Sequence, residues 1–240
     1  MNQESESDNN ILGQVIWLFL GVLGGIGAAY YFLPQVMPSI SASLSGVDVK
    51  AYWYLSRGSA IIAYVLLWLS MLMGLLLSSK LSKTWPGTAK ANDIHKFISL
   101  LGLFFVIFHA LILMGDVYLA ANFWQLFIPL SGFPYRPEWV LWGQVGLFLW
   151  IGLILSSYAR KRIGRKAWRV LHFGSFLMFI FALIHGIGSG TDTALPAMQI
   201  LYWISAGSIV FLILFRIITA ILPEPAANST QQKIPLNEGV

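Results

Sequence analysis

The sequence predicts an all-α integral membrane protein, a bundle of six membrane-spanning helices, from three observations. Hydrophobic residues make up 57% of the 240 residues and charged residues only 10%, whereas soluble domains carry about 25% charged residues. The mean hydropathy of +0.72 leaves too little polar surface to cover one large core. Apolar runs of roughly 20 residues, enough to cross about 30 Å of hydrocarbon, recur along the chain.

These runs define one six-span domain over residues 11–222. An acidic segment, 1–10, precedes it without the positive charge of a secretory signal peptide, so the first span is expected to stay attached. The polar, proline-containing tail, 223–240, is expected to be disordered. We expect the spans near residues 11–33, 51–79, 94–115, 138–159, 168–189 and 198–222.

Basic residues concentrate in two of the connections, and loops rich in lysine and arginine stay in the cytoplasm. Both termini are therefore expected in the cytoplasm, with the protein in the plasma membrane and lipid as its surroundings. No basic stripe with interleaved aromatics indicates a nucleic-acid partner. The two connections contain Lys80, Lys83 and Lys90, and then Arg160, Lys161, Arg162, Arg165, Lys166 and Arg169. An aromatic belt with a short in-plane helix is expected after the third span, at Phe123, Trp124, Phe127, Phe133, Tyr135 and Trp139.

All four histidines lie inside spans, His95 and His109 in the third and His172 and His185 in the fifth. An ionisable group within a bilayer is costly and indicates a function. The separations of 14 and 13 residues correspond to about 21 and 20 Å along two helices that run in the same direction. Histidines at two matched levels can hold two b-type haems through paired imidazoles. We therefore expect two haems stacked between spans three and five, on His95 with His172 and on His109 with His185.

The 13-residue step conflicts with a regular helix. At about 100° per residue, a 14-residue step misses the same face by about 40°, but a 13-residue step misses it by about 140°. Either span five is distorted, or its two haems approach from different directions. Two other interpretations stay open for these histidines, as side chains hydrogen-bonded across helices or as a proton relay.

Secondary candidates lie around the two levels. Gly102 is seven residues from both His95 and His109, where a missing side chain lets a flat macrocycle approach the backbone. Arg57, about 9 Å inside span two, is expected to bind propionates of the outer haem or to hold an acceptor, or else to snorkel. Cations near the inner level could neutralise its propionates or contact anionic lipid, namely Lys96, Arg169 and Lys166.

The chain resembles the ferric reductase-like transmembrane domain family, which includes NADPH oxidases, ferric reductases and the haem membrane subunit of a bacterial methionine sulfoxide reductase system. The resemblance covers spans two to six. It rests on WYLSRGS at residues 53–59, on IGRKAWRVLH at residues 163–172, and on the 14- and 13-residue histidine pairs. It implies six helices, two stacked b haems, an arginine at position 57 and electron flow from the cytoplasm to the outside.

Two departures from the family shape the functional expectation. About 18 polar residues follow the sixth span, so no flavin or nicotinamide site is expected and the donor is a separate cytoplasmic flavoprotein or a quinol. Leu113 stands where superoxide-producing members carry a further histidine. The leading interpretation is an oxidoreductase component that passes electrons to ferric iron, oxygen or a redox partner protein outside. The alternatives are a non-catalytic anchor or assembly subunit of a redox complex, and a histidine-based proton or metal transporter.

Overall fold

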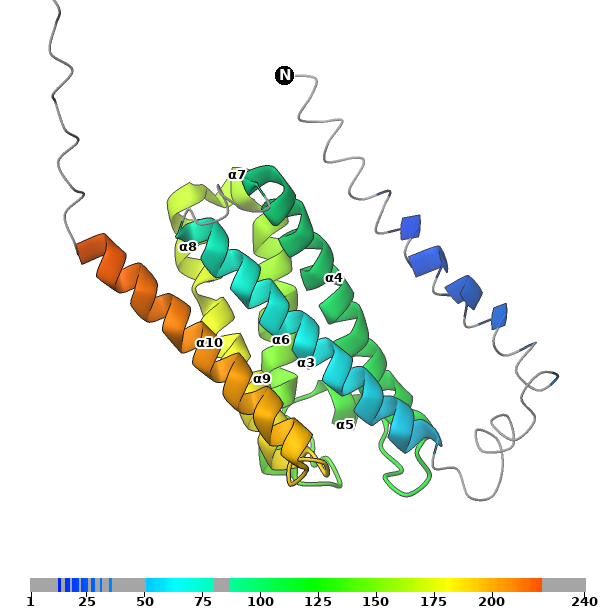
Figure 1. Ribbon diagram of the computed structural model, residues 1–240. Helices are drawn as coiled ribbons and strands as arrows, with labels where there is room; N and C mark the ends of the chain where they lie inside the picture. The colour runs from blue at the N-terminus through cyan, green and yellow to red at the C-terminus, as the bar shows by residue number, and fades with distance from the viewer. Residues whose placement is uncertain are drawn as a thin grey trace, which may run out of the picture. The chain divides into compact units, whose positions relative to one another are not determined.

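Residues 51–79 and 87–221 are described continuously in a computed structural model of the chain, together with scattered positions between 13 and 35. Regular structure in these residues is helical throughout (Figure 1). The elements are α3 (Ala51–Ser78), α4 (Thr88–Ile112), the 3₁₀ turn η2 (Leu113–Gly115), α5 (Phe123–Phe127), α6 (Pro137–Tyr158), α7 (Arg160–Ile163), α8 (Arg165–His172), α9 (Gly174–Ser189) and α10 (Pro196–Ile221).

Five helical stretches are long and apolar enough to cross a membrane, which confirms an all-α, multi-span protein. They match the second to sixth predicted spans and are Ala51–Ser78, Thr88–Gly115, Pro137–Tyr158, Arg165–Ser189 and Pro196–Thr219. The predicted third span, near 94–115, begins earlier in the structure, at Thr88. Its first two turns are helical, but they are too polar to be included in an apolar window. The first predicted span, near 11–33, is described only at scattered residues, which are helical. Segments 1–10 and 223–240, with Lys80 and Lys83, lie outside the described residues.

Prolines and glycines set the helix boundaries. Pro137 and Pro196 are the first residues of α6 and α10, where a fixed φ and a missing N–H suit the first turn. Gly164 has φ +83°, a conformation that glycine adopts readily, and it separates α7 from α8. The basic connection predicted between spans four and five is therefore mostly helical.

The chain divides into two compact units, and the larger contains residues 62–104 and 138–240. Within it α3 is joined to α10 by polar contacts, from Tyr64 to Ser205 at 2.6 Å and from Trp68 Nε1 to Ser208 Oγ at 2.8 Å. Interhelical hydrogen bonds of this kind help to hold membrane helices together, because burial from water does not drive their association. Figure 1 shows α10 as the last long helix of this unit.

The other unit contains residues 1–61 and 105–137. The expected short helix after the third span is present as α5, and its start is fixed by a capping box between Asn122 and Gln125. Trp53 packs edge-to-face on Tyr135, with ring centroids 6.2 Å apart. The aromatic cluster predicted here is split in the structure, since Trp124 is exposed but Phe133 is buried in the unit's core.

Candidate functional site

The structure brings His95 and His172 together in the larger unit. Their ring centroids lie 6.1 Å apart with planes at 76°, and both side chains are partly buried. One iron bound to a nitrogen of each imidazole at about 2 Å would hold two ring centroids about 6 Å apart. The separation of these two rings would therefore allow both imidazoles to bind one iron.

His95 is held by α3. Its Nδ1 lies 2.9 Å from the backbone oxygen of Ser70 and 3.2 Å from the Ser70 hydroxyl. A carbonyl oxygen can only accept a hydrogen bond, so Nδ1 carries the ring proton and Nε2 carries the lone pair. This is the tautomer that binds a metal through Nε2, with an outer partner that fixes the ring.

His109 has the same kind of support in the smaller unit. Its Nδ1 lies 2.8 Å from the backbone oxygen of Ser56 and 2.9 Å from the Ser56 hydroxyl. The same argument places the proton on Nδ1 and the lone pair on Nε2. Both histidines of α4 are thus oriented by a buried serine of α3.

His185 is held by α6 through a backbone carbonyl, because Nδ1 donates to Trp139 O at 3.0 Å. The imidazole lies against Gly143, where a Cβ would come within 2.7 Å of Nδ1. The packing is reciprocal: the Trp139 ring of α6 lies against Gly188 of α9, where a Cβ would collide with the indole. Each helix therefore places a ring on a glycine of the other.

His172 differs from the other three histidines. Its Nδ1 is buried and makes no hydrogen bond to any described residue. Its ring stacks on Trp168, with centroids 4.9 Å apart and planes at 28°. Arg160 lies over the Trp168 ring at 5.4 Å, and the indole nitrogen donates to Ser157 Oγ at 3.2 Å. His172 is positioned by stacking, with no hydrogen bond among the residues described.

The fifth span is interrupted directly after His172. Phe173 separates α8 from α9, and Phe176 N bonds to Phe173 O at 3.1 Å. A contact three residues back is typical of a tighter, overwound turn. A local distortion, one of the two alternatives that the 13-residue spacing left open, is therefore present between His172 and His185.

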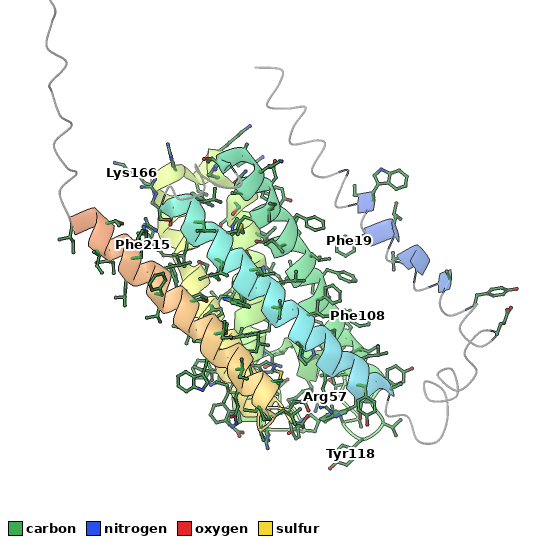
Figure 2. All side chains as sticks on the ribbon, in the orientation of Figure 1. Phe19, Arg57, Phe108, Tyr118, Lys166 and Phe215 are labelled. Atoms are coloured by element: carbon green, nitrogen blue, oxygen red, sulfur yellow. The ribbon has the colours of Figure 1, made fainter. Side chains whose placement is uncertain are left out.

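The secondary candidates occupy diverse surroundings. Gly102 packs against Trp150, whose Cη2 would lie 2.7 Å from an added Cβ, so in the structure this gap accommodates an indole ring. Arg57 is partly buried and lies over the Tyr54 ring at 5.9 Å. Lys96 and Arg169 are exposed neighbours of His95 and His172 in the chain. Figure 2 labels Arg57 on α3 and Lys166 on α8. The cofactor roles of these residues stay predictions.

Sequence reasoning missed the residues that support the histidines. Ser56 and Ser70 are 14 residues apart in α3, and His95 and His109 are 14 residues apart in α4. Two neighbouring antiparallel helices with the same spacing predict two equivalent contacts, so this signal was present in the sequence. Gly143 and Trp168 had no comparable signal, because their contacts depend on how α6, α8 and α9 pack.

No protein-family model, curated protein or solved structure matches the chain. Within residues 51–79 and 87–221, and at the scattered positions before them, no three His, Asp or Glu side chains gather at one point as a metal cluster.

Proposed function

We propose that the protein is a membrane cytochrome b that transfers electrons across the bilayer, with one b-type haem held by His95 and His172. The observation that carries this proposal is the pair of rings at 6.1 Å in a membrane-spanning helix bundle. Porphyrin supplies four ligands to iron, so the protein needs to supply only two. When bound, haem supplies a one-electron couple between ferric and ferrous iron.

The side chains present fit this group. Ser70 fixes His95 with its lone pair on Nε2, which is the arrangement of a ligating histidine. A buried nitrogen without a hydrogen bond is costly in apolar surroundings, and such a nitrogen is found at His172. Binding of iron by this nitrogen itself would remove that cost, which stacking on Trp168 alone does not. The exposed cations Lys96 and Arg169 are available to neutralise propionates.

The proposal extends to a second haem on His109 and His185, from their spacing along the two spans. Their Nδ1 atoms both donate to backbone carbonyls, which supports ligation through Nε2 at each ring. The donor is a cytoplasmic flavoprotein or a quinol, and the acceptor is ferric iron, oxygen or a redox partner protein. Arg57 is a proposed neighbour of the outer haem, as expected from the sequence, whereas the space at Gly102 is taken by the Trp150 ring.

The test is a reduced-minus-oxidised absorption spectrum of the purified full chain, with haem per polypeptide measured as the pyridine haemochrome. Two low-spin b haems per chain are expected, and His95→Ala should retain one. The matched control is Ser79→Ala, since that residue follows α3 directly and its hydroxyl bonds to the Leu75 and Leu76 carbonyls in the last turn of the helix. Absence of haem from the wild-type chain, expressed with ample haem supply, would refute the proposal and favour an anchor or a transporter.

A further inference from the structure

Helix α3 places two buried serines against the two histidines of α4. Ser70 is 6% exposed and Ser56 is 2% exposed. Each presents a backbone oxygen and a hydroxyl to Nδ1 of its histidine, within 2.8 to 3.2 Å. A serine whose two oxygens both face one imidazole nitrogen does more than fill space, because it holds the ring's proton in a three-centre hydrogen bond.

At the Ser70–His95 site, the acceptor of each serine hydroxyl proton can be assigned. Ser99 Oγ donates to the His95 backbone oxygen at 2.6 Å. Its contact with Ser70 Oγ, also 2.6 Å, therefore uses the Ser70 proton. The Ser70 oxygen is left to accept from His95 Nδ1. The network closes with each donor satisfied, which gives a single hydrogen-bond arrangement.

At the Ser56–His109 site the network is shorter. Ser56 Oγ donates to the His109 backbone oxygen at 3.3 Å, so its oxygen accepts from Nδ1 at 2.9 Å. The Ser56 carbonyl also accepts from Ser59 Oγ at 2.9 Å. Leu113 is four residues beyond His109, where Ser99 is four residues beyond His95. The two sites thus share the serine–histidine contact and differ in the neighbouring hydroxyl, which is Ser99 at the first and Ser59 at the second.

We propose that Ser70 and Ser56 are positioning residues that set the redox potentials of the irons bound at His95 and His109, each serine acting on one site alone. The inference rests on the proposed function. A hydrogen bond accepted from Nδ1–H makes Nε2 a stronger electron donor, and a stronger axial donor favours ferric iron and lowers the potential. Removal of the hydroxyl leaves the carbonyl bond in place, so the histidine keeps its tautomer while the donation weakens.

The experiment is a spectroscopic redox titration of the full chain in lipid nanodiscs. Ser70→Ala should raise one of the two midpoint potentials and Ser56→Ala the other. The expected change is about threefold in the redox equilibrium, or about 30 mV at 59 mV per tenfold for one electron. Ser70→Thr, which keeps the hydroxyl, should restore the wild-type potential. Ser79→Ala, in the turn directly after α3 and without a histidine contact among the residues described, should leave both potentials unchanged.

The outcomes separate the inference from the proposed function. Two low-spin haems with potentials that neither alanine variant moves would overturn the inference and leave the cytochrome assignment intact. A shift of both potentials by a single variant would also overturn it, because each serine contacts one histidine. Loss of a haem in Ser70→Ala would also overturn it, because the Ser70 carbonyl is expected to keep His95 in its ligating tautomer without the hydroxyl. A wild-type chain without haem overturns both proposals.

Discussion

The histidines of α4 and those of α8 and α9 are supported in different ways. His95 and His109 repeat one arrangement, a serine carbonyl and hydroxyl at Nδ1. His172 has a stacked indole and a buried nitrogen without a hydrogen bond to the described residues. His185 has a tryptophan carbonyl and a glycine surface.

The difference follows from the spacing. A 14-residue step in a regular helix returns to nearly the same face, so one neighbouring helix can support both histidines in the same way. A 13-residue step does not, and the fifth span contains the interruption at Phe173. Histidines on either side of an interruption meet unlike neighbours. A 14-residue spacing therefore lets one neighbouring helix hold both histidines by the same contacts. With a 13-residue spacing, each histidine is held by different residues.

The largest effect is expected from Gly143→Ala in α6, which disturbs the support of His185 and leaves the support of His95 and His109 unchanged. The added Cβ would lie 2.7 to 2.8 Å from three atoms of the His185 ring, and the ring cannot move without weakening its bond to Trp139 O. We expect a loss of about 2 to 3 kcal/mol in the free energy of unfolding. Gly152→Ala on the same helix has open space at Cβ and should be neutral or stabilising by up to about 1 kcal/mol. Denaturant titration of the detergent-solubilised chain compares the two, and equal losses would contradict the prediction.

A second test compares His172→Leu with His95→Leu in haem-free protein. The first change removes a buried nitrogen that has no hydrogen bond to the described residues, and should stabilise the chain by about 1 kcal/mol. The second removes the bond to Ser70 and should destabilise it by about 1 kcal/mol. Unfolding measured without haem should separate the two variants by about 2 kcal/mol. A similar loss in both would show that His172 is as well satisfied as His95.

A smaller effect is expected from Trp168, which supports His172 by stacking. Trp168→Ala removes the ring stacked on His172, an interaction of about 1 kcal/mol. We expect haem release to an excess of acceptor apoprotein to accelerate about fivefold, since 1.4 kcal/mol corresponds to tenfold. Trp168→Phe keeps an aromatic face, so its rate of haem release should lie between those of the wild type and Trp168→Ala. Release that is unchanged in Trp168→Ala would mean that stacking does not position His172.

The smallest effect is expected from Ser99→Ala, which compares the His95 and His109 sites of α4. Ser99→Ala removes the hydroxyl that accepts from Ser70 and makes the His95 site resemble the His109 site, where Leu113 stands. The free energy of unfolding should fall by about 0.5 to 1 kcal/mol. Ser156→Ala in α6, whose hydroxyl bonds to the Leu153 carbonyl of its own helix, is the control for a lost serine hydroxyl in the same denaturant titration, and an equal loss in both variants would contradict the prediction.

Hydropathy was sufficient to predict the second to sixth spans, because lipid requires long apolar helices with satisfied backbones. It placed the start of the third span at residue 94, whereas α4 begins at Thr88. Polar residues such as Lys90 and Asp93 lower the hydropathy of a window without ending a helix. Window hydropathy therefore locates the apolar part of a span and misses polar turns beyond it.

The candidate site was predictable only in part. Spacing placed His95 and His172 at one level, and the structure brings their rings together. It could not indicate that Trp150 would lie against Gly102, since no sequence pattern specifies which ring enters a gap between helices. Nor could it give the surroundings of His172, which depend on the interruption at Phe173 and on the α7–α8 turn.

The exchange of rings and glycines between α6 and α9 has a consequence for assembly. Trp139 lies on Gly188 and His185 lies on Gly143, with a hydrogen bond from one ring to the other residue's carbonyl. These contacts use only side chains and backbone of the chain itself, and close packing of this kind drives helix association in lipid. The α6–α9 pair can therefore form in the newly inserted polypeptide without the proposed haem. His185 would then be held in this orientation by the protein alone, and the proposed haem would bind to a side chain that is already positioned.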